Sequence, residues 1–224
     1  MLHKLKYSPI YSYQDGLIIN AIKFIDVNMV MYITTILIGF IINYKTNDCI
    51  MRTVLTYLAI TLWTYYVHDI MHKYENSPIG KIHAIHHNSK YKDDISVEIL
   101  EILVNVIIIG GLFWIPVMLW IENTIGFRIV NYYMILIWSF MFMTYHLINY
   151  HIYNADVHCQ HHQENGENNY GPEWYDILFN TKAEHSKIED MNSGVINNII
   201  LTFIVLYLKD TPYDLVDIFR KKVV

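Results

Sequence analysis

The stretch ILEILVNVIIIGGLFWIPVMLWI, residues 99–121, carries one charged side chain, Glu101, in twenty-three residues. The hydrocarbon core of a bilayer is about 30 Å thick and needs about twenty such residues in a helix. This stretch is therefore long enough to cross a membrane, and it decides the fold class. Three more apolar segments, at 27–44, 50–67 and 127–147, complete four predicted transmembrane helices. A shorter apolar run at 195–208 is predicted to be an interfacial or packing helix.

The composition of the chain supports a membrane protein. Hydrophobic residues make up 54% of the sequence and charged residues 17%, whereas a soluble domain has about 25% charged residues. A soluble all-α protein would need amphipathic helices to cover the apolar segments, and the sequence offers few. The net charge of −5 and the lack of a basic stripe exclude a nucleic-acid-binding surface. We predict a single all-α domain over residues 1–224, an integral membrane bundle of four transmembrane helices.

Positive charge predicts the orientation of this bundle. With four spans, the loops at 46–49 and 122–126 share one side of the membrane, and only Lys45, Arg52 and Arg128 flank them. The other thirteen of sixteen Lys and Arg residues lie on or near the opposite side. Because positive loops accumulate in the cytosol, we expect both termini and the histidine-rich segments to face the cytosol, where they form a helical cap.

Ten of the twelve histidines fall into four groups at or after the ends of the apolar segments. The groups are HDIMH (68–72), HAIHH (83–87), HLINYH (146–151) and HCQHH (158–162). On a helix, residues three and four apart share a face, so the imidazoles of each group are expected to point in the same direction. Neutral imidazole is a common ligand for zinc, copper, iron and nickel. The groups therefore predict a metal site, and ten histidines indicate two ions; His3 and His185 belong to no group.

The order of these groups, followed by NNYGPEWYDILFNT at 168–181, resembles the fatty acid hydroxylase / sterol desaturase superfamily of integral membrane di-iron oxygenases. The resemblance covers residues 68–181. Members of the superfamily usually carry glycine where Asn180 stands. Tyr170, Gly171, Trp174 and Asp176 are expected to shape the closing turn and helix.

Carried over group by group, the resemblance implies ten metal ligands. Asp69 and Asp156 lie beside predicted ligands, and each is a candidate to accept the second ring N–H of a ligand, which would orient that ring. The implied ligands are His68, His72, His83, His86, His87, His146, His151, His158, His161 and His162.

The resemblance further implies a di-iron enzyme that uses O2 and two electrons to hydroxylate or desaturate a lipid. The expected substrate is a fatty acyl chain, a sphingolipid or a sterol, and the expected location is the endoplasmic reticulum. The electrons would come from a separate cytochrome b5-type donor with its reductase. Histidine spacing alone does not distinguish iron from zinc, so zinc is an alternative occupant.

Two other functions are alternatives to this hypothesis. A zinc-dependent membrane hydrolase is disfavoured because the chain has no HExxH sequence and more histidines than one zinc ion needs. A non-enzymatic metal-binding or transport protein would place ionisable residues along a path inside the helices. Only Glu101, Arg52 and Arg128 occur in the four segments, all near segment ends.

Overall fold

The computed structural model describes residues 10–87, 95–148, 157, 160–161 and 168–223, with the side chain of His86 left out. Within these residues the chain is helical, and an isolated antiparallel bridge between Ile10 and Lys187 is the sole extended pairing. The helices are α1 (Gly16–Val27), α2 (Met29–Thr46), α3 (Ile50–Lys73), α4 (Pro78–His86), α5 (Ile95–Val104), α6 (Trp114–Ile125), α7 (Tyr132–Leu147), α9 (Glu173–Phe179), α10 (Val195–Leu208) and α11 (Leu215–Val223). Short turns are the 3₁₀ helices η1 (Tyr13–Asp15) and η5 (Met191–Gly194) and the π-helical turn η3 (Asn105–Ile109).

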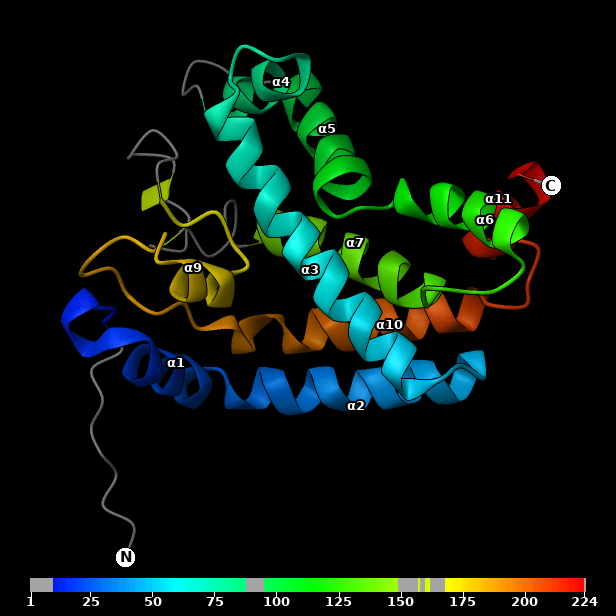
Figure 1. Cartoon of the computed structure of the whole chain (residues 1–224), viewed down its shortest axis with the longest axis horizontal. Helices are drawn as coiled ribbons and strands as arrows, with labels where there is room; N and C mark the ends of the chain where they lie inside the picture. Colours follow the sequence, from blue (N-terminus) through cyan, green and yellow to red (C-terminus); the bar gives the residue numbers. More distant parts are fainter. Residues whose placement is uncertain (1–9, 88–94, 149–156, 158–159, 162–167, 224) are drawn as a thin grey trace, which may run out of the picture.

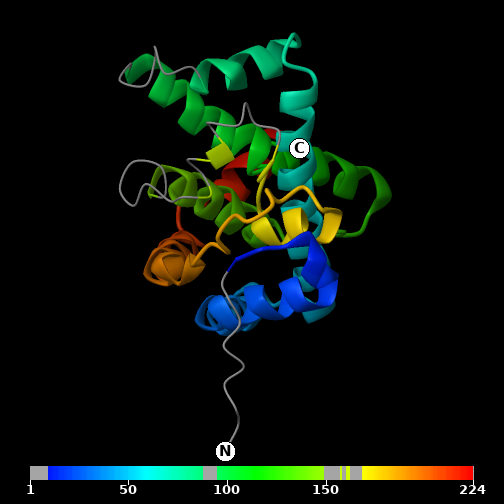
Figure 2. The ribbon, with the colours of Figure 1, turned by 90° about the vertical axis from the view of Figure 1, so that its left-hand side faces the viewer.

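Helices α2, α7 and α10 lie side by side, and α3 crosses them obliquely (Figures 1 and 2). Helix α7 is the centre of this bundle, because half of its residues, from Tyr132 to Met141, are buried. The main core cluster joins α7 to Ile42 of α2, Ile115 of α6 and Val205 of α10. The outer faces of α2 and α10 remain apolar and exposed; Phe203 of α10, for example, is 70% exposed. Such faces suit contact with lipid chains.

Among the described residues, three helical stretches are long and apolar enough to cross a membrane: Met29–Thr46, Ile95–Ile125 and Met191–Leu208. The first and second contain most or all of the predicted spans 27–44 and 99–121. The third differs from the interfacial helix predicted for 195–208, because η5 continues directly into α10 and lengthens it to eighteen residues. Four spans are therefore not confirmed. Helix α3 carries too many polar residues to qualify, and α7 has only sixteen residues.

The predicted span 99–121 is not a continuous helix. Helix α5 passes into a π-helical turn, and the chain bends at Gly110 and Gly111 before α6 begins (Figure 1). The carbonyl groups released by this break find donors on neighbouring helices. Three side chains serve them: Trp63 Nε1 donates to Ile108 (2.9 Å), Thr64 Oγ1 to Ile109 (3.0 Å) and Ser139 Oγ to Gly110 (2.8 Å).

The two ends of the described chain lie at opposite ends of the bundle. At one end, the Tyr11 hydroxyl bonds Asn180, so the segment before α1 lies next to the end of α9. At the other end, the hydroxyl of Tyr133, at the start of α7, bonds Asp214 just before α11. Because α10 runs the full length of α7, it carries α11 away from the predicted metal site. Helix α11 therefore lies at the end of the bundle away from the histidines, and the predicted cytosolic placement of both termini and the metal site stays a prediction.

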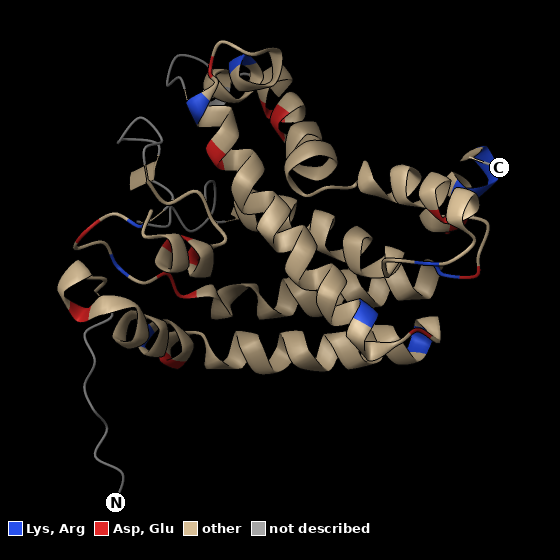
Figure 3. Cartoon of the chain, in the orientation of Figure 1, with Lys and Arg blue, Asp and Glu red and all other residues tan. Residues whose placement is uncertain are grey.

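This placement also changes the charge distribution. Figure 3 shows basic residues at both ends of the bundle. Of the twelve Lys and Arg residues that the structure describes, seven lie at the end with α11, namely Lys45, Arg52, Arg128, Lys209, Arg220, Lys221 and Lys222. The cytosolic orientation is predicted from three Lys and Arg residues on one side against thirteen on the other. That count places Lys209, Arg220, Lys221 and Lys222 among the thirteen, whereas the structure places them at the same end as Lys45, Arg52 and Arg128.

Candidate metal centre

The first two histidines of the centre lie on the last turns of α3. This helix extends to Lys73, beyond the predicted end at residue 67, and therefore carries His68 and His72 on one face, four residues apart. His68 is buried in the bundle, and His72 is partly buried. Their rings lie side by side, with centroids 5.1 Å apart.

Helix α4 places the second histidine group against the first. Ser77 caps α4 by accepting the backbone N–H of Gly80, and Pro78 occupies the first turn. A Cβ on Gly80 would lie 2.2 Å from the Tyr74 carbonyl oxygen, so only glycine permits this close approach of α4 to the end of α3. His83 and His87, four residues apart, consequently face His68 and His72.

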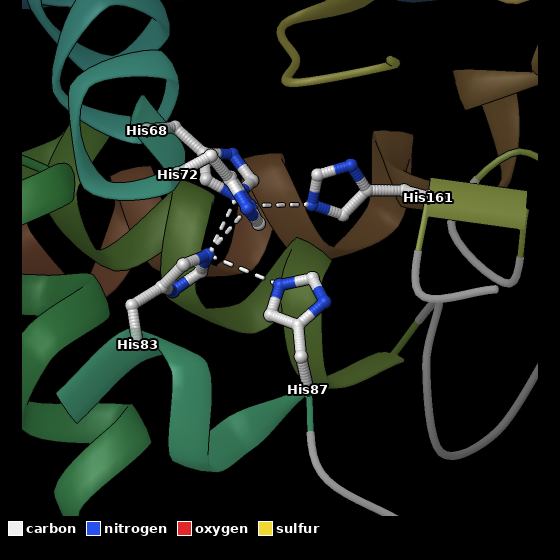
Figure 4. A group of neighbouring side chains, drawn as sticks. All are labelled: His68, His72, His83, His87 and His161. Atoms are coloured by element: carbon white, nitrogen blue, oxygen red, sulfur yellow. Dashed lines mark hydrogen bonds between the residues drawn. The ribbon is translucent and has the colours of Figure 1, made fainter. Parts of the chain in front are cut away.

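His161, nearly ninety residues after His72 in the chain, completes a five-histidine cluster with His68, His72, His83 and His87 (Figure 4). One ring nitrogen from each histidine lies within 4.8 Å of all the others. The Nε2 atom of His83 lies 3.1 Å from that of His68, 2.9 Å from that of His72 and 3.1 Å from that of His87. His161 Nε2 is 3.1 Å from His72 Nε2.

Hydrogen bonding among the rings does not account for this convergence. A neutral imidazole nitrogen has either one proton or one lone pair, yet Nε2 of His83 meets three other Nε2 atoms. A shared cation does account for it. With metal–imidazole bonds of about 2.1 Å, neighbouring ligands at right angles are about 3.0 Å apart and opposite ligands about 4.2 Å apart. The Nε2 separations of 2.9 to 3.1 Å match neighbouring ligands at right angles, so the five residues are suited to hold one transition-metal ion.

Backbone carbonyl groups orient two of the rings. His68 Nδ1 lies 2.5 Å from the Tyr170 oxygen, and His161 Nδ1 lies 2.6 Å from the Asn168 oxygen. Each Nδ1 therefore carries the proton, which leaves the Nε2 lone pair directed into the cluster. Burial, followed by the nearby rings of His161 and His72, lowers the pKa of His68 well below its usual value. The ring is thus neutral at pH 7, as a metal ligand must be.

The segment 168–181 holds these carbonyl groups in place. The Asp176 carboxylate accepts the backbone N–H groups of Tyr170 (2.9 Å) and Gly171 (2.7 Å) and the hydroxyl of Thr181 (2.8 Å). Burial raises the pKa of Asp176 to about 7, although the Gly171 and Thr181 bonds oppose the shift. The expected structural role of Tyr170, Gly171 and Asp176 is confirmed.

The C-cap of α9 explains the departure at Asn180. This residue has φ 59°, in the left-handed region, where glycine is preferred and asparagine is the best-tolerated alternative. Asn180 therefore takes a backbone conformation that glycine would also adopt at this position. Its side-chain oxygen also accepts a bond from the Tyr11 hydroxyl (2.8 Å), which joins the N-terminal segment to the turn.

His146 lies outside the five-histidine cluster. It ends α7, and its Nε2 is 2.5 Å from a carboxylate oxygen of Glu101 on α5, with both side chains only 7% exposed. A carboxylate on Nε2 leaves Nδ1 as the nitrogen available to a metal. Glu101 was not predicted as a site residue; its position as the single charge in the most apolar segment was the signal that pointed to it.

The remaining predicted site residues divide into two sets. Asp69 pairs with Lys73 (2.7 Å) and bonds the Tyr170 hydroxyl, so its role in orienting a ligand stays a prediction. Four predicted residues, His151, Asp156, His158 and His162, lie outside the described residues, as does the side chain of His86.

A cavity of about 140 Å³ opens from the centre into the bundle. Its lining includes His68 and His146 on one side and continues between α2 and α7 through Tyr32, Phe142 and Trp138. The volume is roughly ten times what one water molecule needs. The cavity therefore offers room for an apolar ligand next to the histidines.

Comparison with known proteins supports one family. Residues 53–181 match the family model described as fatty acid hydroxylase. The match begins within α3, ends just after α9 and contains all four histidine groups. No curated protein and no solved structure matches the chain.

Proposed function

The chain belongs to the fatty acid hydroxylase family, and from this membership and the histidine cluster we propose that it is a membrane-bound, metal-dependent oxygenase that hydroxylates or desaturates a lipid. The observation that carries the proposal is the meeting of five imidazole nitrogens within 4.8 Å. The adjoining cavity, which reaches His68 and His146, supports an apolar substrate. We propose an integral membrane location, in the endoplasmic reticulum.

We assign the five clustered histidines to one ion. His146 is assigned to a second ion, together with His86, His151, His158 and His162 from the family pattern. The proposed metal is iron, with zinc as an alternative occupant. The histidine pattern includes no carboxylate. In this chain the Glu101 carboxylate contacts His146, so it would lie near the second ion.

A C–H bond of a lipid chain has no acidic proton and no electrophilic centre, so its oxidation requires a redox cofactor. The bound irons would supply the activation of O2, using two electrons from a cytochrome b5-type donor and its reductase. The protein's own contribution is to orient the ligands through the Tyr170 and Asn168 carbonyl groups. The cavity walls, which are mostly apolar but include Glu173, Asp176 and Glu189, hold the substrate beside the histidines and exclude bulk water from it.

The proposal is tested by lipid profiling in a host that makes diverse lipids. Cells expressing the parent protein are expected to contain an oxidised or desaturated lipid whose formation needs O2. His161→Ala should abolish this product. His185→Ala is the matched control, because His185 lies at the surface and belongs to no group, and it should retain the product.

Purified protein provides the second arm. Anaerobic reconstitution with iron, followed by addition of O2 and a reductant, should restore the same product, and reconstitution with zinc should not. A product that forms equally with zinc, or with His161→Ala, would contradict the proposed oxygenase. If the iron-loaded protein formed no product from any lipid class, the proposed oxygenase function would be contradicted as well.

A further inference from the structure

A second, smaller cavity lies beyond the inner end of the first. It has a volume of about 10 Å³ and is lined by Thr35, Ile38, Tyr57, Met134, Ile137, Trp138 and Met141. Four of these residues, Thr35, Tyr57, Trp138 and Met141, also line the large cavity. The two spaces thus lie on either side of a shared wall.

The rings of Tyr57 and Trp138 are the two aromatic members of this wall. They meet edge to face, with centroids 5.8 Å apart. Trp138 is fixed by its indole N–H, which donates to Thr64 Oγ1 (2.9 Å). The Thr64 hydroxyl is itself bonded to the carbonyl of Ile109 at the helix break. Tyr57, in contrast, packs from α3 against the indole, so its ring is the replaceable part of the wall.

Helix geometry gives the distance from the histidines to this wall. Trp138 and His146 line the same cavity from one helix, eight residues apart, which corresponds to about 12 Å. Tyr57 and His68 are eleven residues apart on α3, or about 16 Å. At about 1.25 Å per carbon of an extended chain, this depth holds roughly ten to thirteen carbons.

We propose that the large cavity is the site for the acyl chain and that Tyr57, supported by Trp138, is its closed end. Tyr57 then sets the longest chain segment accepted beyond the oxidised carbon. This inference rests on the proposed function for the identity of the occupant. The walls suit an acyl chain, because between the histidines and the closed end α7 presents Trp138, Met141 and Phe142 along one side.

Replacement of the Tyr57 ring should join the two cavities. Ile38 lies three residues beyond Thr35 on α2, and Met134 lies four residues beyond Trp138 on α7. The joined cavity is therefore deeper by about 4.5 to 6 Å, which corresponds to about four methylenes. Each methylene newly buried should favour the longer chain roughly fourfold.

The experiment compares Tyr57→Ala with the parent protein on an equimolar mixture of lipids that differ only in acyl-chain length. We expect the product distribution of Tyr57→Ala to shift by about four methylenes towards longer chains. Tyr57→Phe keeps the ring and should keep the parental cut-off. Ile38→Phe added to Tyr57→Ala refills the space and should restore the shorter cut-off. Tyr44→Ala, on the exposed face of α2, controls for loss of a tyrosine.

A binding measurement separates this inference from the proposed function. Primary alcohols of graded chain length are added to each purified protein, and the thermal stabilisation is recorded without turnover. If Tyr57→Ala is stabilised by longer alcohols than the parent protein while no variant makes product, that result supports the proposed acyl-chain site and contradicts the proposed oxygenase function. An unchanged cut-off in Tyr57→Ala, or an equal shift in Tyr57→Phe, overturns the inference.

Discussion

At the scale of single residues, the centre depends on where each imidazole nitrogen points. Nε2 of His72 lies 2.9 Å from that of His83 and 3.1 Å from that of His161, so this residue joins the second histidine group to the last. The spacing predicted metal binding by four histidine groups, and all five clustered histidines belong to the ten ligands that the family resemblance implied. It did not predict the carbonyl groups of Tyr170 and Asn168, because a backbone oxygen has no residue identity to recognise.

Removal of His72 should therefore weaken metal binding more than removal of any isolated histidine. We expect His72→Ala to lower the affinity for the metal at least about tenfold, a loss no smaller than that seen when a residue that only supports a ligand is replaced. Elemental analysis of purified protein, with metal titration, measures this. His185→Ala should bind metal as the parent does, and equal retention by both variants would argue against the five-histidine site.

A buried ion pair beside the centre gives a second prediction. Lys182 is fully buried, and its Nζ lies 2.5 Å from the carboxylate of Glu173, which is 3% exposed and also accepts the backbone N–H of Glu189. Lys182→Met leaves this carboxylate unpaired, so the free energy of unfolding should fall by about 3–5 kcal/mol. Thermal unfolding in detergent reports the change as a lower melting temperature.

Two controls accompany this variant. Lys209→Met removes a pair whose partner, Asp210, is exposed, so the change should stay within about 1 kcal/mol. Glu173→Gln added to Lys182→Met removes the unpaired charge and should recover part of the loss. A melting temperature for Lys182→Met equal to that of the parent would show that the pair is not needed for stability.

At the scale of elements, the docking of α4 on α3 brings two histidine groups together. Gly80→Ala introduces a Cβ at 2.2 Å from the Tyr74 carbonyl oxygen and 2.9 Å from that of Met71, so α4 must move away. Alanine is a better helix former than glycine by about 1 kcal/mol. A loss of metal therefore cannot come from a weaker helix.

We expect Gly80→Ala to lower the affinity for the metal by about tenfold or more while circular dichroism shows unchanged helix content. Gly39→Ala on α2 is the control, since its Cβ meets nothing within 4 Å. Normal metal binding by Gly80→Ala would mean that α4 can shift without displacing His83.

The break between α5 and α6 shows what hydropathy cannot predict. Residues 99–121 are apolar apart from Glu101 and Asn105, and a hydropathy window responds to side-chain transfer energy rather than to backbone direction. Gly110 and Gly111 lower the helix propensity of this segment. The bend itself becomes stable because Trp63, Thr64 and Ser139, all from other helices, bond the released carbonyl groups.

At the scale of the whole molecule, α10 decides the position of the C-terminus. If Met29–Thr46 and Met191–Leu208 both cross the membrane, Cys49 and α11 lie on the same side, opposite the segment that precedes α1. The arrangement with four spans puts the C-terminus on the other side from Cys49.

Labelling in sealed vesicles distinguishes the two arrangements. A membrane-impermeant maleimide applied to the Cys159→Ser variant reports the side of Cys49, which is exposed. A protease-sensitive tag after residue 224 reports the side of the C-terminus. We expect both sites to react from the same side of the vesicle. Reaction from opposite sides would show that α10 does not cross.

The sequence by itself determined the residue types and their local spacing: apolar segments of membrane length, and histidines three and four residues apart on helical faces. These depend on interactions within one turn or one segment, which the order of residues sets directly. The tertiary structure decided the rest: which five imidazoles meet, the carbonyl groups that orient them, the pairing of Glu101 with His146, and the wall formed by Tyr57 and Trp138. Each of these joins residues from segments far apart in the sequence, and their meeting depends on packing that no local pattern encodes.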